Sequence, residues 1–329
     1  VVGYATATGP DGPFPPAHQY LGAGVAPRLW RDGAGRIHAT WARQRTADDV
    51  VSYARSASAG GPITGALVLG IGRNPHVATS ADGQWVYVVY YRVVGGVEVV
   101  FCRRSGNGGS SFDGEVQVTD PAFSRGITPE FGRGLAVSPD GHQVHVAFRG
   151  MSGNSWQVRY RRSSDFGASF GPEQNLHIPL HATYAPSVAT VENRVHVLLK
   201  RDNYGSDQIW MRTSTDSGAT WPDAQKARVD DGETRYPSET ILDYVNPAEV
   251  VIHGDGSITV AFVDNTSGDA DVIIDRSVDG GTTFRNDVRV DDAPLGVDSV
   301  NPSLAGDVGT NVVVAWEDDR SGQPDVYFR

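Results

Sequence analysis

The chain has 329 residues, of which 39% are hydrophobic and 20% are charged, and its formal net charge is −11. This charge argues against nucleic acid and anionic membrane surfaces as partners, and no apolar run of about 18 residues predicts membrane insertion. The 39 glycines and 19 prolines fit an all-β protein that is rich in turns. The single cysteine, Cys102, lies in an apolar run, so we expect a small buried residue rather than a nucleophile.

The predicted elements start with an alternating segment at residues 1–6, and a longer unit then recurs along the chain. Each unit has a strand that begins near a proline, a polar turn, and a second strand of alternating β-branched and aromatic residues. The units begin at Pro27, Pro75, Pro129, Pro186, Pro247 and Pro302. Their second strands lie at residues 37–41, 86–90, 144–148, 195–199, 258–262 and 312–316.

A third strand in each unit leads into a turn motif of the form Ser-x-Asp-x-Gly-x-Thr-Trp/Phe. The motif is clear at residues 163–170, 214–221 and 277–284, weaker at 105–112 and degenerate at 56–63. In such a turn the Asp or Asn side chain caps backbone N–H groups, and glycine supplies the positive φ. We therefore interpret Asp165, Asp216, Asp279 and Asn107 as structural turn residues.

A repeat of about 50 to 60 residues indicates one supersecondary unit used several times, as in a propeller. The predicted fold is an all-β, six-bladed β-propeller with four-stranded antiparallel blades, in one domain over residues 1–329. The blades span roughly residues 20–72, 73–120, 126–178, 184–230, 244–291 and 299–329. The last blade stops after its third strand, so we expect residues 1–8 to supply its outer strand and close the ring.

The turn motifs resemble the Asp-boxes, or BNR repeats, of the sialidase (neuraminidase) superfamily, and the resemblance covers nearly the whole chain. It implies a six-bladed propeller, whereas the activity has to be argued from the site. Sialidases carry an Arg-Ile-Pro motif whose arginine helps to hold the substrate carboxylate, and here Val25 stands in that place before Ala26 and Pro27. The family's Tyr–Glu pair would have its counterparts among Tyr184, Tyr236, Glu239 and Glu249.

In sialidase-like propellers the loops between second and third strands build the ligand face. Counting two residues past the last aromatic or leucine of each second strand gives Arg43, Arg92, Gly150, Arg201, Asp264 and Asp318. Arg149 adds a cation beside Gly150. Because guanidinium groups match carboxylates in geometry, we predict a ligand site from Arg43, Arg92, Arg149 and Arg201, to which the resemblance to sialidases adds Tyr236 and Glu249.

Two functions remain open at this point. The first is a secreted module that binds a carbohydrate, in particular an acidic glycan, or a protein ligand at its loop face without classical sialidase activity. The alternative is an exo-acting, sialidase-like glycoside hydrolase in which Asp48, Asp264 or Asp318 is the general acid. No cofactor is expected, apart from calcium at Asp264, Asp269 and Asp271. Few lysines and many turns fit an extracellular location.

Overall fold

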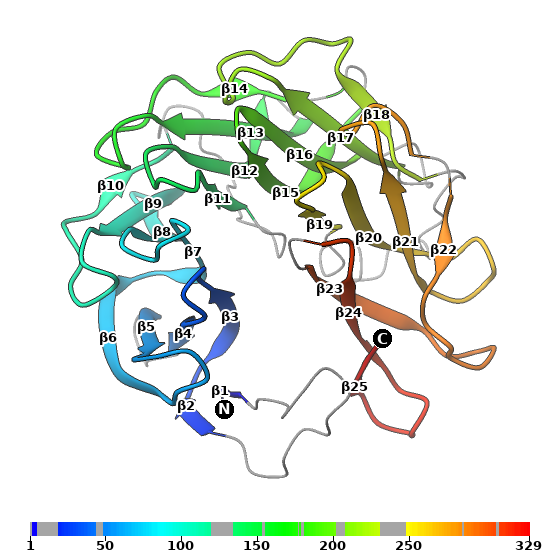
Figure 1. The fold of residues 1–329 in the computed structure, drawn as a ribbon, viewed down its shortest axis with the longest axis horizontal. Coiled ribbons are helices and arrows are strands. Elements are labelled where there is room, and N and C mark those ends of the chain that lie inside the picture. Colours follow the sequence, from blue (N-terminus) through cyan, green and yellow to red (C-terminus); the bar gives the residue numbers. More distant parts are fainter. Residues whose placement is uncertain are drawn as a thin grey trace. The chain divides into compact units, whose positions relative to one another are not determined.

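The computed structural model describes residues 2–4, 19–43, 49–119, 134–152, 155–176, 178, 181–201, 208–230, 248–284, 286–306 and 309–329. These residues form strands joined by turns (Figure 1). In this part of the chain no helix is long and apolar enough to cross a membrane. The predicted all-β class is confirmed.

Six successive antiparallel sheets, which we call blades 1 to 6, follow one another along the described chain. Blade 1 contains β3 (Val25–Arg31), β4 (Ile37–Arg43), β5 (Val50–Ser56) and β6 (Ile63–Ile71). Blade 2 contains β7 (Arg73–Thr79), β8 (Val86–Val94), β9 (Val97–Ser105) and β10 (Val116–Gln117). Blade 3 contains β11 (Leu135–Val137), β12 (Val144–Ser152), β13 (Ser155–Ser163) and β14 (Gln174–Asn175).

The remaining blades repeat the order. Blade 4 contains β15 (Thr183–Val191), β16 (Arg194–Arg201), β17 (Gln208–Ser214) and β18 (Lys226–Arg228). Blade 5 contains β19 (Glu249–Ile252), β20 (Ile258–Asp264), β21 (Asp271–Ser277) and β22 (Val288–Arg289). Blade 6 contains β23 (Ser299–Gly306), β24 (Val312–Asp318) and β25 (Asp325–Phe328). All six predicted second strands lie inside observed strands.

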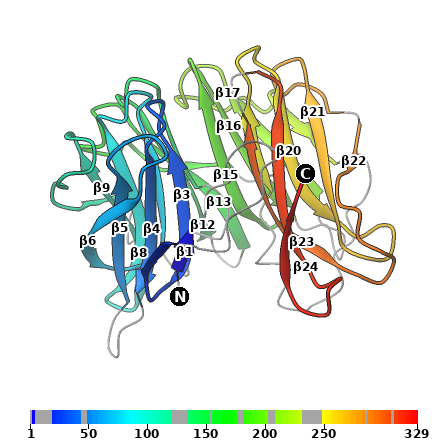
Figure 2. The ribbon, with the colours of Figure 1, turned by 60° about the horizontal axis from the view of Figure 1, so that its bottom comes forward.

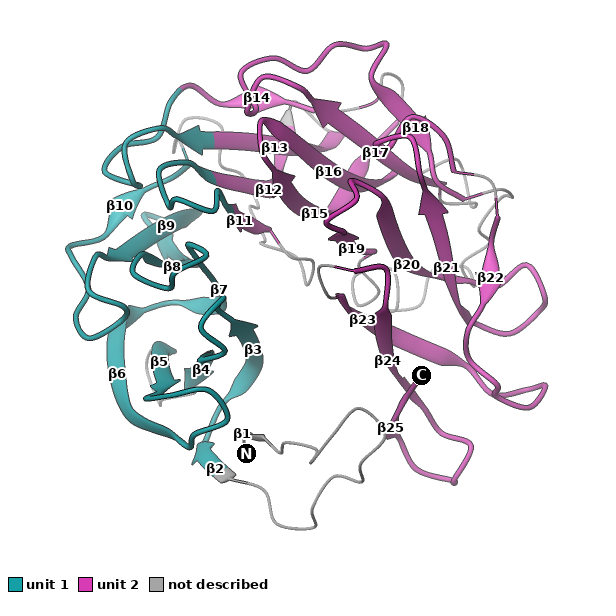
Figure 3. Cartoon of the chain, in the orientation of Figure 1, with its two compact units in different colours: residues 1–124, 137–144, 162–171 teal, residues 125–136, 145–161, 172–329 magenta. Residues whose placement is uncertain are grey.

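The chain divides into two compact units, which are described separately (Figure 3). Unit 1 comprises residues 1–124, 137–144 and 162–171, and unit 2 comprises residues 125–136, 145–161 and 172–329. Within unit 2, β15, β16 and β17 run side by side as neighbours in one sheet (Figure 2).

The N-terminal strand differs from the sequence prediction. The structure pairs β1 (Val2–Tyr4) with β2 (Gln19–Gly22) in a two-stranded sheet. Among the described residues, blade 6 has the order β23-β24-β25, without the fourth strand that residues 1–8 were expected to supply. The pairing with β2 closes a short loop, which costs less chain entropy than pairing with a strand at the far end of the sequence.

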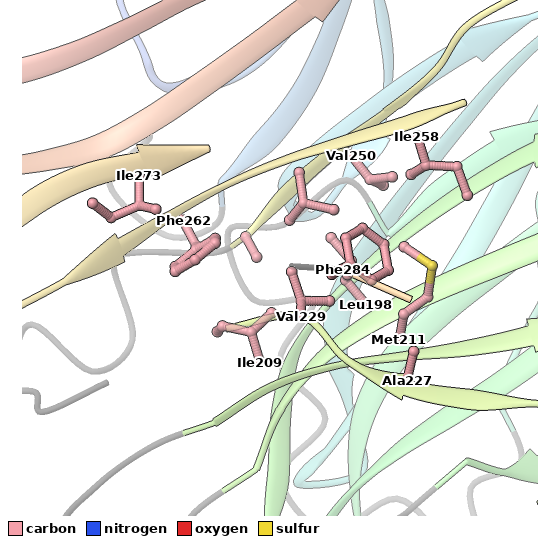
Figure 4. Close-up of a cluster of buried hydrophobic side chains, with 12 residues drawn as sticks. Leu198, Ile209, Met211, Ala227, Val229, Val250, Ile258, Phe262, Ile273 and Phe284 are labelled. Atoms are coloured by element: carbon pink, nitrogen blue, oxygen red, sulfur yellow. The ribbon is translucent and has the colours of Figure 1, made fainter. Parts of the chain in front are cut away.

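Neighbouring blades bury apolar side chains against each other inside each unit. In unit 2, Leu198 and Met211 of blade 4 pack with Val250 and Phe262 of blade 5 in one buried cluster (Figure 4). The recurrent strand aromatics Trp41, Tyr90, Phe148, Phe262 and Trp316 are all buried, as expected for core residues. Cys102 is also buried, as predicted, and burial raises the pKa of its thiol to about 12.

The Asp-box turns are held by a repeated set of hydrogen bonds. In blade 4 the Ser214 hydroxyl donates to Asp216 Oδ1 at 2.7 Å, and the backbone N–H of Thr220 donates to the same oxygen at 2.8 Å. The Thr220 hydroxyl donates to Asp216 Oδ2 at 2.6 Å and, with the other donors, lowers the pKa of Asp216 to about 2. Asp165, Asp279 and Asn107 accept equivalent bonds in their own turns.

Each of these turns docks against the preceding blade of its unit. A Cβ placed on Gly218 of the blade 4 box would stand 1.9 Å from the hydroxyl of Tyr160 in blade 3, and Gly109 of blade 2 meets Tyr53 of blade 1 in the same way. Because these contacts leave no room for a Cβ, the glycine is required by packing as well as by its positive φ. The arginine before the box serine contacts the Asp-box of the next blade, since Arg55 donates to Ser110 at 2.9 Å.

Candidate functional site

In blades 2 to 5 the Asp-box turn marks one end of the blade, and the loop in which the second strand passes into the third marks the opposite end. We use the same names for the corresponding ends of blades 1 and 6. In blade 4, Val195 pairs with Ser214 of the Asp-box, whereas Arg201 pairs with Gln208 at the loop end. The predicted ligand and catalytic residues on second strands lie in the loop-end part of their strands: Arg43, Arg92, Arg149 and Arg201 as ligand residues, and Asp264 and Asp318 as candidate acids.

In blade 2 the loop-end arginine is neutralised within its own sheet. The two terminal nitrogens of Arg92 donate to the two carboxylate oxygens of Glu115 at 2.6 and 2.5 Å, and the guanidinium lies 4.0 Å over the Phe101 ring. Tyr90 donates to the same carboxylate at 2.9 Å. Burial raises the pKa of Tyr90 to about 12, so this Tyr–Glu pair holds a protonated, inaccessible phenol rather than a nucleophile.

In blade 3 the loop-end cation stacks on an aromatic ring. The guanidinium of Arg149 lies 4.0 Å from the centroid of the Trp156 ring, and Arg149 is 6% exposed. Trp156 is half-buried. Such a pairing holds the charge in a fixed position through a cation–π contact.

Blade 4 has a similar pair of an arginine and a tryptophan, and the neutral side chain of Gln208 accepts a hydrogen bond from each of them. Arg201 Nη1 donates to Gln208 Oε1 at 3.0 Å, and Trp210 Nε1 donates to the same oxygen at 3.1 Å. The Arg201 guanidinium lies 5.9 Å from the Trp210 ring centroid. Its Nε is buried and has no hydrogen-bond partner among the residues that the structure describes. Among the described residues of its blade, Arg201 therefore has donors without a hydrogen-bond partner.

The two acidic loop ends have local partners. Asp264 accepts hydrogen bonds from the backbone and hydroxyl of Thr266 at 2.8 and 3.0 Å. Asp318 is buried, pairs with Arg320 at 2.6 Å and accepts a hydrogen bond from Trp316 at 3.0 Å. Burial raises the pKa of Asp318, but the donors outweigh it and lower the pKa below its usual value. A general acid at neutral pH needs a raised pKa, so this geometry does not favour that role for Asp318.

The expected calcium ligands are occupied by different partners. Asp269 accepts from the backbone of Gly296 at 2.7 Å, and Asp271 pairs with Arg289 at 3.0 Å and accepts from Ser267 at 2.6 Å. Within the described ranges, no group of three or more His, Cys, Asp or Glu side chains is arranged to hold a metal ion. The structure thus does not bring Asp264, Asp269 and Asp271 together as a calcium site.

Two of the remaining predicted site residues lie on described strands. Arg43 ends β4, and Glu249 begins β19 and is 7% exposed. Asp48 and Tyr236 lie outside the described residues.

Sequence reasoning missed Asp230. Its Oδ1 accepts a hydrogen bond from the backbone N–H of Ile209, the neighbour of Gln208, at 2.8 Å, and its Oδ2 pairs with Arg228 at 2.8 Å. Burial raises the pKa of Asp230 to about 7, with Arg228 acting in the opposite direction. The signal in the sequence is the pair Val229–Asp230 after the outer strand, which Val290–Asp291 repeats in blade 5.

No protein-family model matches this chain, and no curated protein matches it. Solved structures do. An α-L-arabinanase of Penicillium chrysogenum, complexed with arabinobiose, is 12% identical over 94% of this chain and 94% of its own, with a TM-score of 0.58. A polysaccharide lyase, an ulvan lyase bound to GlcA(1-4)Rha3S, is 14% identical over 92% of this chain and 77% of its own, with a TM-score of 0.53.

A sialidase of Trypanosoma rangeli, in complex with the inhibitor DANA, is 10% identical over 99% of this chain and 57% of its own, with a TM-score of 0.55. At these identities the likeness shows the fold alone. The predicted sialidase-like, six-bladed β-propeller fold is confirmed at that level.

Proposed function

We propose that the protein binds an acidic glycan at the loop ends of blades 3 and 4 in unit 2. The observation that carries this proposal is the group formed by Arg201, Gln208 and Trp210, in which a guanidinium meets a neutral amide and a half-buried ring. Arg92 in unit 1 is the contrast, because Glu115 already takes both of its terminal nitrogens.

The chemistry of this group suits a carboxylated sugar. A guanidinium has five N–H donors in a fixed fork that matches a carboxylate, and the described residues give Arg201 a neutral partner. The half-buried faces of Trp210 and Trp156 offer flat apolar area for the C–H face of a sugar ring. Ligand sites commonly combine aromatic walls with a few fixed polar groups.

The similar structures support the carbohydrate part of the proposal. The arabinanase holds arabinobiose, and the ulvan lyase holds GlcA(1-4)Rha3S. We extend only the ligand class to this chain, and an extracellular location belongs to the same proposal.

Binding is tested with tetragalacturonate as the probe and its neutral methyl ester as the comparison, by isothermal titration calorimetry. Charge-assisted hydrogen bonds contribute about 1.5–3 kcal/mol each, so we expect Arg201→Gln to weaken binding about tenfold or more. Trp210→Leu should weaken it as well, whereas Arg276→Gln, a matched change of an exposed arginine at the Asp-box end of blade 5, should not. Equal affinity of wild type and Arg201→Gln, or of the acid and its ester, would refute the proposal.

A glycoside hydrolase is the second candidate, and the observation that favours it is the carboxyl of Asp230. Its pKa of about 7 is in the range that a general acid needs, and it bonds to the strand residue next to Gln208. Because Asp230 is buried, this role also requires that substrate binding exposes the carboxyl. Turnover of fluorogenic uronides by the wild type, lost in Asp230→Asn with tetragalacturonate binding retained, would establish it. Unchanged turnover in that variant would exclude Asp230 as the acid.

A further inference from the structure

A pocket of about 190 Å³ opens at the Asp-box end of unit 2, between blade 4 and the Asp-box of blade 5. Arg194, Thr213, Gln225 and Lys226 line it from blade 4, and Asp279 to Thr282 line it from blade 5. It lies at the opposite edge of the blades from Arg201 and is independent of the proposed glycan site.

The pocket is open because blade 4 lacks an arginine side chain that blades 1 and 2 have at the corresponding position. The residue before the Asp-box serine is Arg55 in blade 1 and Arg104 in blade 2. Arg104 donates to the backbone oxygens of Asp165 and Phe166 in the next Asp-box, at 3.4 and 3.0 Å. The same position in blade 4 is Thr213, whose short side chain leaves the space open.

The charges around the pocket leave a cation available. Arg194 is exposed and donates to the Gly280 backbone oxygen at 3.5 Å, and it has no carboxylate partner among the described residues. Lys226 adds a second cation, which Asp223 offsets in part from 3.4 Å. The carboxylate of Asp279 accepts hydrogen bonds from donors in its own turn.

The neutral side chains that line the pocket can form hydrogen bonds with hydroxyl groups of a ligand. The side-chain oxygen of Gln225 is buried and has no hydrogen-bond partner in the described part of the chain. Thr213 Oγ1 lies 3.0 Å from His196 Nδ1, and burial lowers the pKa of His196 to about 4, so this imidazole adds no charge at neutral pH. The Thr213 oxygen therefore keeps capacity to bond a ligand hydroxyl.

We infer that this pocket binds a small hydroxycarboxylate, whose carboxylate pairs with Arg194 and Lys226 and whose hydroxyl donates to Gln225. Its volume of about 190 Å³ is close to that of a cavity of roughly 150 Å³ that holds one benzene ring. A single six-membered ring, such as one uronic acid residue, is the appropriate size.

The test is a calorimetric titration with D-glucuronate and its neutral counterpart D-glucuronamide. The wild type should bind glucuronate at least tenfold more tightly than the amide. Thr213→Arg restores the arginine found in blades 1 and 2, so it should fill the pocket and reduce glucuronate affinity at least tenfold. Arg194→Gln, an exposed change, should reduce the affinity by a similar factor, whereas Arg276→Gln, an exposed change outside the pocket lining, should leave it unchanged. Arg201→Gln is titrated in parallel.

Three results would overturn this inference. They are no measurable glucuronate binding by the wild type, unchanged binding in both Thr213→Arg and Arg194→Gln, and a loss confined to Arg201→Gln, which would assign the signal to the loop end. Because tetragalacturonate binding is read separately with Arg201→Gln, failure of this site and failure of the proposed function are distinguishable.

Discussion

Replacing Gly218 by alanine is expected to destabilise the protein strongly. Gly218 has a φ of 77°, and an added Cβ would stand 1.9 Å from Tyr160 Oη and 2.7 Å from Cζ. Tyr160 cannot move aside easily, because it is buried and its hydroxyl lies 2.6 Å from His145 Nδ1. Backbone strain of about 1–3 kcal/mol and overpacking of about 1–3 kcal/mol together give a loss of about 2–6 kcal/mol.

Urea denaturation measures this loss, and Gly256→Ala is the matched control. Gly256 has a similar φ of 80°, but a Cβ there would meet nothing within 4 Å. The control should lose only the strain component, about 1–3 kcal/mol. Equal losses in the two variants would show that the Asp-box does not dock against Tyr160 as described.

Asp230→Asn is expected to change how stability depends on pH. Because burial raises the pKa of Asp230 from 3.8 to about 7, the folded state binds its proton more tightly than the unfolded state. The free energy of unfolding of the wild type should therefore fall as pH rises from about 4 to about 7. Each pKa unit corresponds to about 1.4 kcal/mol, which sets an upper limit of about 4 kcal/mol on the loss.

The asparagine variant keeps an oxygen that can accept from Ile209 and has no charge to bury. Its free energy of unfolding, relative to the wild type, should rise progressively between pH 4 and pH 7 and level off above that range. Parallel stability curves for the two proteins over this interval would contradict the raised pKa of Asp230.

The fold could be predicted because its signals are local and repeated. The alternating second strands and the Asp-box turns each depend on neighbours within about eight residues, so turn chemistry and side-chain alternation are readable from the chain. The pairing of β1 with β2 was not foreseen, since no local signal in residues 1–8 selects one edge partner over another.

The site could be predicted only in outline. Counting along the second strands located Arg92 and Arg201, but not their partners. Glu115 and Trp210 contact these arginines from other segments of the chain. The strand register that brings each pair together cannot be read from either segment alone. The replacement of arginine by Thr213 is visible in the sequence, yet it becomes meaningful only once Arg104 is seen to reach the next blade.

The most direct test of the central claim is a crystal structure of the protein with tetragalacturonate. We predict a sugar carboxylate within hydrogen-bonding distance of the Arg201 guanidinium, with a sugar ring against Trp210 or Trp156. An oligosaccharide bound elsewhere, with Arg201 still bonded to Gln208, would contradict a glycan site at the loop ends of blades 3 and 4.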